Sequence, residues 1–185
     1  MAPRLKKKRS TPPPREVKPL AFLSYAQFND KHDSGWVTQF RRQLSGEVQA
    51  QTGVPFDIFQ DRKDIRWGEN WRQRIKTSID SATFFITILT PSFLNSEECL
   101  KELRQFLAHE KKLKRNDLIL SVHYIPCKNI LPRLDPKLTK AIRDHQLWDW
   151  TALRFESLED LKTRKVLADL AKDIRDAIDR GSDFT

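Results

Sequence analysis

The seven residues from Thr83 to Leu89 are β-branched, aromatic or aliphatic throughout and carry no charge. A strand with one face in water alternates apolar and charged or polar residues, and this run has no such alternation. Pro91 follows closely and ends the pattern, because proline cannot donate to a strand ladder. The run therefore predicts a central strand of a parallel sheet that is covered on both faces.

On either side of this run, short apolar segments alternate with segments whose apolar residues recur every three or four positions. The first pattern predicts strands and the second predicts amphipathic helices. Further strands are predicted at 20–24, 54–59, 117–125 and 146–148. Helices are predicted at 36–48, 71–79, 97–114, 137–143 and 158–178. This alternating order predicts an α/β fold of the flavodoxin-like kind, a three-layer sandwich around a five-stranded parallel sheet.

Scarce glycine excludes the common nucleotide-binding signatures. The chain has five glycines, and no two of them lie close enough for a GxGxxG fingerprint or a P-loop. Its two cysteines, Cys99 and Cys127, are too few for a disulfide framework or a zinc cluster and suit a reducing, cytoplasmic setting. No run approaches the ~20 apolar residues of a membrane span. The four histidines show no metal-ligand spacing, so no metal site is expected.

The first 19 residues differ in composition from the rest of the chain. They hold seven basic side chains, one acid and half of the ten prolines, so they carry +6 of the net charge of +9. Such a segment cannot build a core, and we predict a disordered basic tail over 1–19, a folded domain over 20–180 and a short end over 181–185. The tail offers weak contacts to anionic partners, or it only keeps the chain soluble.

Functional residues of a parallel α/β sheet lie at the carboxyl ends of its strands. Three polar segments follow predicted strands, at 24–30, 60–71 and 91–103. The first begins Ser-Tyr, the second runs from Gln60 through Asp-Arg to Gly68, and the third contains Ser-Glu-Glu-Cys-Leu-Lys-Glu-Leu.

These three segments together resemble the Toll/interleukin-1 receptor (TIR) domain, in particular its bacterial form, over about residues 20–180. The strand that ends in Ser24-Tyr25 is similar to the first box of the family, and 61–68 is similar to its second box, the BB loop. The stretch 96–103 resembles the Ser-x-x-Cys-x-x-Glu-Leu start of the third major helix. Two positions depart from common patterns: Trp67 replaces a proline before the BB-loop glycine, and Glu98 replaces the tryptophan of many plant members.

The resemblance implies an enzyme that cleaves NAD⁺ as its substrate, with no cofactor, and releases nicotinamide with ADP-ribose or a cyclic isomer. It implies activation by self-association through the loop 60–68, in bacterial defence or cell-death signalling. It also implies that Glu102 is the catalytic carboxylate. Around it, the residues expected to bind NAD⁺ are Ser24, Tyr25, Arg62, Trp67, Ser96 and Cys99.

Several of these residues also have a structural interpretation. Ser96 suits an N-cap with Cys99 at the N3 position, Glu102 suits a solvated helix face, and Arg62 suits an exposed loop. Glu102 falls at the edge of the apolar helix stripe, where it can border a cleft without being sealed in the core.

A second function remains open for the whole chain. It is that of a non-catalytic adaptor, which would bind other TIR domains through the BB loop without turning over NAD⁺.

Overall fold

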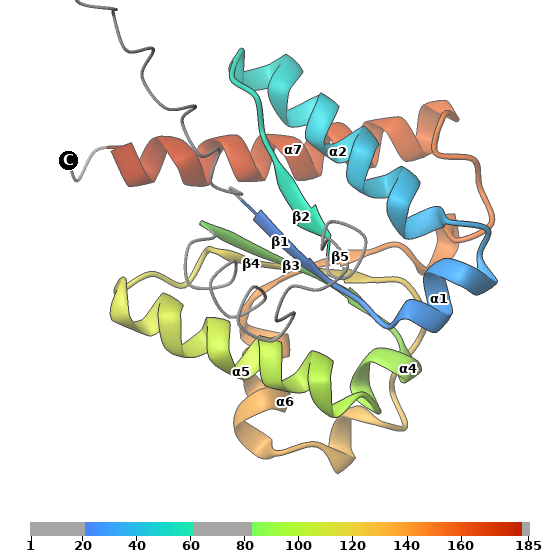
Figure 1. Cartoon of the computed structure of the whole chain (residues 1–185), viewed down its shortest axis with the longest axis vertical. Coiled ribbons are helices and arrows are strands. Elements are labelled where there is room, and N and C mark those ends of the chain that lie inside the picture. Colours follow the sequence, from blue (N-terminus) through green and yellow to red (C-terminus); the bar gives the residue numbers. More distant parts are fainter. Residues whose placement is uncertain (1–20, 61–82, 183–185) are drawn as a thin grey trace, which may run out of the picture.

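The computed structural model describes residues 21–60 and 83–182 of the chain, with side chains described to Arg180. Its centre is a five-stranded parallel sheet with the strand order β2-β1-β3-β4-β5 (Figure 1). The strands are β1 (Ala21–Ser24), β2 (Ile58–Gln60), β3 (Phe84–Leu89), β4 (Ile119–His123) and β5 (Gln146–Asp149). The predicted flavodoxin-like α/β fold is confirmed, and β3 is the central strand.

Aromatic stacking joins β1 and β3, two of the three inner strands. All six residues of β3 are buried, as are the four of β1. The ring of Phe85 stacks on Phe22 of β1 at 5.7 Å on one side and on Phe106 of a covering helix at 5.1 Å on the other. Ser24, the last residue of β1, pairs with Thr87 of β3. The packed core therefore extends to the carboxyl end of β1, where Ser24 lies.

Helices cover both faces of the sheet (Figure 1). On one face lie α2 (Trp36–Thr52) and α7 (Leu161–Ser182). On the other lie α4 (Pro91–Leu94), α5 (Glu97–Lys112) and α6 (Pro136–Asp144). The short helix α1 (Gln27–His32) follows β1, and single 3-10 turns form at Leu131–Arg133 and Thr151–Leu153. The predicted helices at 36–48, 97–114, 137–143 and 158–178 are confirmed with shifted ends.

Local chemistry explains several of these ends. Gly53 stops α2 in the left-handed region, with φ of 73°, and its N–H donates to the carbonyl of Gln49. Thr90 caps α4, because its hydroxyl accepts from the N–H of Phe93 while Pro91 occupies the first turn.

The sequence interpretation was wrong at four places. It took the residues of α1 and α4 for loops, and it began the second strand at Val54, whereas β2 begins at Ile58. The late start follows from pairing, because β1 begins at Ala21 and Ala21 is the partner of Ile58. The predicted strand 117–125 is shortened to Ile119–His123, the part that pairs with β3.

Several predictions concern residues outside the described ranges. They are the basic tail at 1–19, the helix at 71–79 and all of the loop 60–68 after Gln60. Within the ranges that the structure describes, none of the helices has the length and apolar character to span a bilayer.

Candidate functional site

Ser24 and Glu102 meet at the carboxyl end of β1. The Ser24 hydroxyl donates a hydrogen bond of 2.5 Å to Oε2 of Glu102, although 78 positions separate the two residues in the chain. Ser24 is 0% exposed and Glu102 is 8% exposed. The structure thus joins two of the residues that the sequence selected, the predicted catalytic residue and one predicted NAD⁺-binding residue.

The start of α5 is what brings Glu102 to this place. The Ser96 hydroxyl accepts a hydrogen bond of 3.3 Å from the N–H of Cys99 and so caps the helix. From there, the inward face of α5 carries the buried side chains of Cys99, Leu103 and Phe106. Glu102 lies on the same inward face and is more buried than a residue at the edge of an apolar stripe. The N-cap role of Ser96 is confirmed, and a solvated position for Glu102 is wrong.

Tyr25, another residue expected to bind NAD⁺, has a buried side chain. It is 7% exposed, and its hydroxyl accepts a hydrogen bond of 2.9 Å from Nε2 of Gln60, the last residue of β2. The same nitrogen donates to the hydroxyl of Thr38 on α2 at 3.1 Å. Thr38 in turn donates from its N–H and its hydroxyl to the two carboxylate oxygens of Asp30. This polar chain connects β1, β2, α1 and α2 beside the site.

Sequence reasoning missed this supporting chain and a second one. The Thr90 hydroxyl donates 2.8 Å to Oδ1 of Asn29, and both side chains are buried. That contact ties α1 to the start of α4, so both short helices at the carboxyl edge are held by buried polar side chains. The Thr-Pro pair at 90–91 was a usable signal for α4, because threonine caps helices and proline favours the first turn.

A second cluster lies at the carboxyl ends of β4 and β5. Trp36 stacks on Tyr124 at 4.2 Å and contacts Trp150 edge-on at 5.8 Å. Burial and the Asp33 carboxylate raise the pKa of Tyr124, so its hydroxyl stays protonated and donates to Asp33 at 2.8 Å. Trp150 is fully buried and packs edge-on against the rings of both Trp36 and Phe40.

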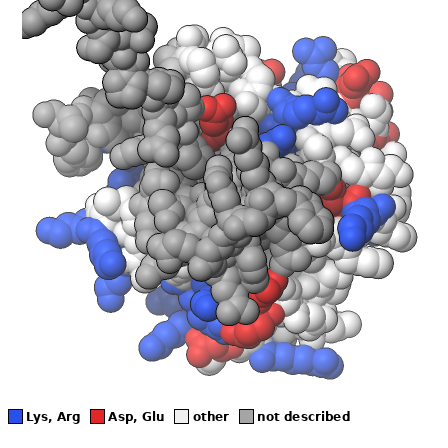
Figure 2. Space-filling view, viewed as in Figure 1, with Lys and Arg blue, Asp and Glu red and all other residues white. Residues whose placement is uncertain are grey.

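The remaining predicted site residues lie in 61–82, outside the described ranges: Arg62 and Trp67, with Arg66 and Trp71 beside them. Among the described residues, no cluster of three or more His, Cys, Asp or Glu side chains could hold a metal ion. Figure 2 shows basic and acidic side chains interspersed around the rim of the described surface in that view.

The chemistry open to this arrangement is that of a single anchored carboxylate. Glu102 is held between a helix and the end of a strand, so its position is fixed before any ligand binds. A preorganised carboxylate in a largely buried setting stabilises positive charge on a nearby carbon far more than it would in water.

Three comparisons bear on this site. A family model described as TIR domain matches residues 21–163. A probable 2' cyclic ADP-D-ribose synthase, BdTIR, from Brachypodium distachyon is 29% identical over 93 residues, 46% of this chain and 42% of that protein. The match therefore spans less than half of the relative. The solved TIR domain of the Toll-related receptor TRR-2 from Hydra magnipapillata is 20% identical with a TM-score of 0.52, covering 84% of this chain and 97% of that one. This structural likeness supports the fold.

Proposed function

This chain belongs to the TIR domain family, and on that basis we propose that it cleaves the bond between nicotinamide and ribose in NAD⁺. The observation that carries the proposal is the Glu102 carboxylate, anchored by Ser24 at the carboxyl edge of the sheet. The similarity to the Brachypodium relative, a probable cyclic ADP-ribose synthase, supports the same chemistry, because cyclic ADP-ribose is NAD⁺ that has lost nicotinamide.

One carboxylate suffices for this reaction. Nicotinamide carries the positive charge of NAD⁺ on its ring and departs as a neutral molecule, so no acid is needed to protonate it. The ribose carbon becomes oxocarbenium-like as the bond breaks, and the negative charge of Glu102 stabilises it. Attack by water then yields ADP-ribose, and attack by another group of the same molecule yields a cyclic isomer. We propose that the product acts as a signal in defence or cell death.

The test is to incubate the purified chain with NAD⁺ at rising protein concentration and to separate the products by chromatography. We expect free nicotinamide together with ADP-ribose or a cyclic isomer. A folded chain that leaves NAD⁺ intact at every concentration would overturn the proposal and favour an adaptor that only binds other TIR domains.

Ser24→Ala is expected to lower kcat about tenfold, because a hydrogen bond to a charged group contributes ~1.5 kcal/mol and here it orients Glu102. Steady-state kinetics on NAD⁺ measure the change. Ser121→Ala is the matched control, since Ser121 is equally buried on β4 but contacts Thr87. Equal activity of the two variants would show that Ser24 does not orient the carboxylate.

Removal of residues 1–17 is expected to leave the cleavage rate unchanged. The segment holds most of the net charge of the chain but no apolar run that could pack on the domain. Its contacts should be salt-sensitive and independent of the site. The check compares NAD⁺ cleavage by the truncated and full chains at matched concentration and salt. A lost activity with an unchanged circular dichroism spectrum would assign the tail a role in catalysis.

A further inference from the structure

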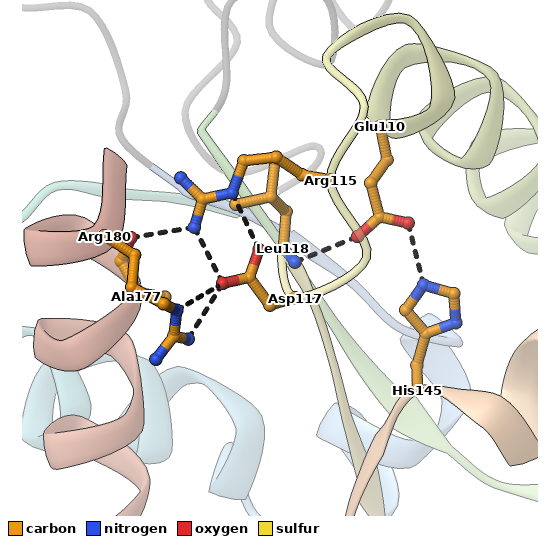
Figure 3. A network of polar contacts seen from close by, with 7 residues as sticks. All are labelled: Glu110, Arg115, Asp117, Leu118, His145, Ala177 and Arg180. Atoms are coloured by element: carbon orange, nitrogen blue, oxygen red, sulfur yellow. Dashed lines mark hydrogen bonds and ion pairs between the residues drawn. The ribbon is translucent and has the colours of Figure 1, made fainter. Parts of the chain in front are cut away.

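A second buried carboxylate on α5 is not used by the proposed reaction. Glu110 is 3% exposed, and its two oxygens contact two different elements (Figure 3). Oε1 accepts a hydrogen bond of 2.9 Å from the N–H of Leu118, just before β4. Oε2 lies 2.7 Å from Nε2 of His145, the residue between α6 and β5. Glu110 therefore ties the end of α5 to the starts of β4 and β5.

The contacts of His145 determine its protonation. Nδ1 lies 2.7 Å from the carbonyl of Ala141, which can only accept, and Nε2 faces the carboxylate of Glu110, which also accepts. Both ring nitrogens must then carry a proton, so the pair is an imidazolium with a carboxylate. The hydrogen bond that His145 donates to Glu110 raises the pKa of His145 above its ordinary value, and burial opposes this shift without cancelling it.

Two other charged side chains act on this pair, one on His145 and one on Glu110. Asp144, at the end of α6, favours the charged imidazolium. Arg115, in the turn between α5 and β4, interacts with the charge of Glu110 and is itself held by Asp117. Figure 3 shows both groups of contacts side by side around the start of β4.

Glu102 and Glu110 belong to the same rigid helix. Eight positions separate them, just over two turns or about 12 Å along the axis, so both point toward the sheet side. At one end, α5 contacts β1 through Glu102 and Ser24. At the other end, it contacts β4 and β5 through Glu110, Leu118 and His145. Movement of α5 along the sheet would break both contacts together.

We propose that Glu110 and His145 are positioning residues for the cleavage of NAD⁺. Their contact holds α5 in the register that brings Glu102 to Ser24. It does so only while His145 is charged. The inference rests on the proposed function. The charged pair persists below the pKa of His145 in the folded protein. As the pH rises through that pKa, the ring loses one of its two protons. Only one ring nitrogen can then donate, so either the Glu110 carboxylate or the Ala141 carbonyl faces a lone pair, and the ion pair between α5 and the start of β5 is lost.

Glu110→Gln separates the charge from the contact. The amide oxygen still accepts from Leu118, and the amide nitrogen donates to Nε2 of a neutral His145, while Nδ1 keeps its bond to Ala141. All partners are satisfied without a proton on Nε2, so the variant should fold and keep α5 in place at pH values where His145 is neutral.

The experiment measures kcat and KM for NAD⁺ against pH in the wild type, Glu110→Gln and Glu97→Gln. The last is the matched control, because Glu97 forms an exposed pair with Arg104 on the same helix. In the wild type, kcat should fall about tenfold or more above the pKa of His145, with KM little changed, since small misplacements of a catalytic group cost that much. Glu97→Gln should keep this fall, and Glu110→Gln should lack it. Identical profiles in all three proteins overturn the proposal.

A readout without turnover separates this inference from the proposed function. The carboxyl ¹³C signal of Glu102, assigned by its loss in Glu102→Gln, is followed by NMR together with the ring protons of His145. In the wild type, the Glu102 carboxyl signal should shift at the same pH midpoint as the ring protons of His145. In Glu110→Gln, this shift of the Glu102 signal, the coupled step, should be absent. If the wild-type protein leaves NAD⁺ intact but shows the coupled step, the proposed function is wrong and the positioning of Glu102 by Glu110 and His145 is supported. If it cleaves NAD⁺ but lacks the coupled step, only the positioning proposal is wrong.

Discussion

Glu102→Gln is expected to reduce NAD⁺ cleavage by about 10²-fold or more while the protein stays folded. The amide keeps the size of the carboxylate, and its oxygen can still accept the hydrogen bond from Ser24. What it removes is the negative charge beside the developing oxocarbenium ion. The rate of nicotinamide release, measured by chromatography on equal amounts of folded protein, gives the loss.

A stability measurement and a control variant show whether the loss of cleavage comes from the missing charge of Glu102. Thermal unfolding of Glu102→Gln should resemble that of the wild type, because the buried contact is retained. Glu97→Gln removes a charge from the first turn of the same helix, where the side chain is exposed, and should cleave NAD⁺ normally. Cleavage by Glu102→Gln within a few-fold of the wild type would assign the catalysis to another group.

Cleavage per molecule is expected to rise with protein concentration, and Trp67→Ala is expected to lower it at least tenfold at a fixed concentration. The resemblance implies that the loop 60–68 completes the site of a neighbouring protomer. In the described part of the chain, β2 ends at Gln60 and lies beside β1, the strand that carries Ser24. Aromatic residues contribute most to such contacts, which is why Trp67 is chosen.

The measurement is specific activity from nanomolar to high micromolar protein, with the mass of the assembly followed by light scattering. Head-to-tail contacts of one loop with the next site build open assemblies instead of closed pairs, so the mass should keep rising with concentration. Constant activity per molecule, unaffected by Trp67→Ala, would mean that each monomer holds a complete site.

The sequence pattern predicted those strands and helix ends that depend on residues close together in the chain. The uncharged run from Thr83 to Leu89 became the central strand. The helix expected at 36–48 formed as α2, which ends where Gly53 adopts the left-handed conformation that suits glycine. Ser96 capped α5 as its residue type favours. In each case, the deciding interaction lies within a few residues of the pattern, so the sequence alone contains the signal.

Contacts between distant residues could not be predicted in the same way. The bond from Ser24 to Glu102 spans 78 positions, and the contact of Glu110 with His145 spans 35. The resemblance named Glu102, but nothing in the helical pattern predicts that a serine at the end of β1 would hold it. Likewise, Tyr25 was expected to bind NAD⁺, and its hydrogen bond with Gln60, which lies 35 positions away in the chain, could not be predicted.

The stoichiometry of nicotinamide released per NAD⁺ consumed by the wild-type chain tests the proposed function most directly. Concentrated protein is incubated with NAD⁺, and both molecules are quantified over time in the same chromatogram. Cleavage at the ribose carbon beside Glu102 predicts one nicotinamide for each NAD⁺ lost, with the adenine and both phosphates retained in one product. Intact NAD⁺ at every concentration, or its loss as two mononucleotides without free nicotinamide, would contradict the proposed reaction.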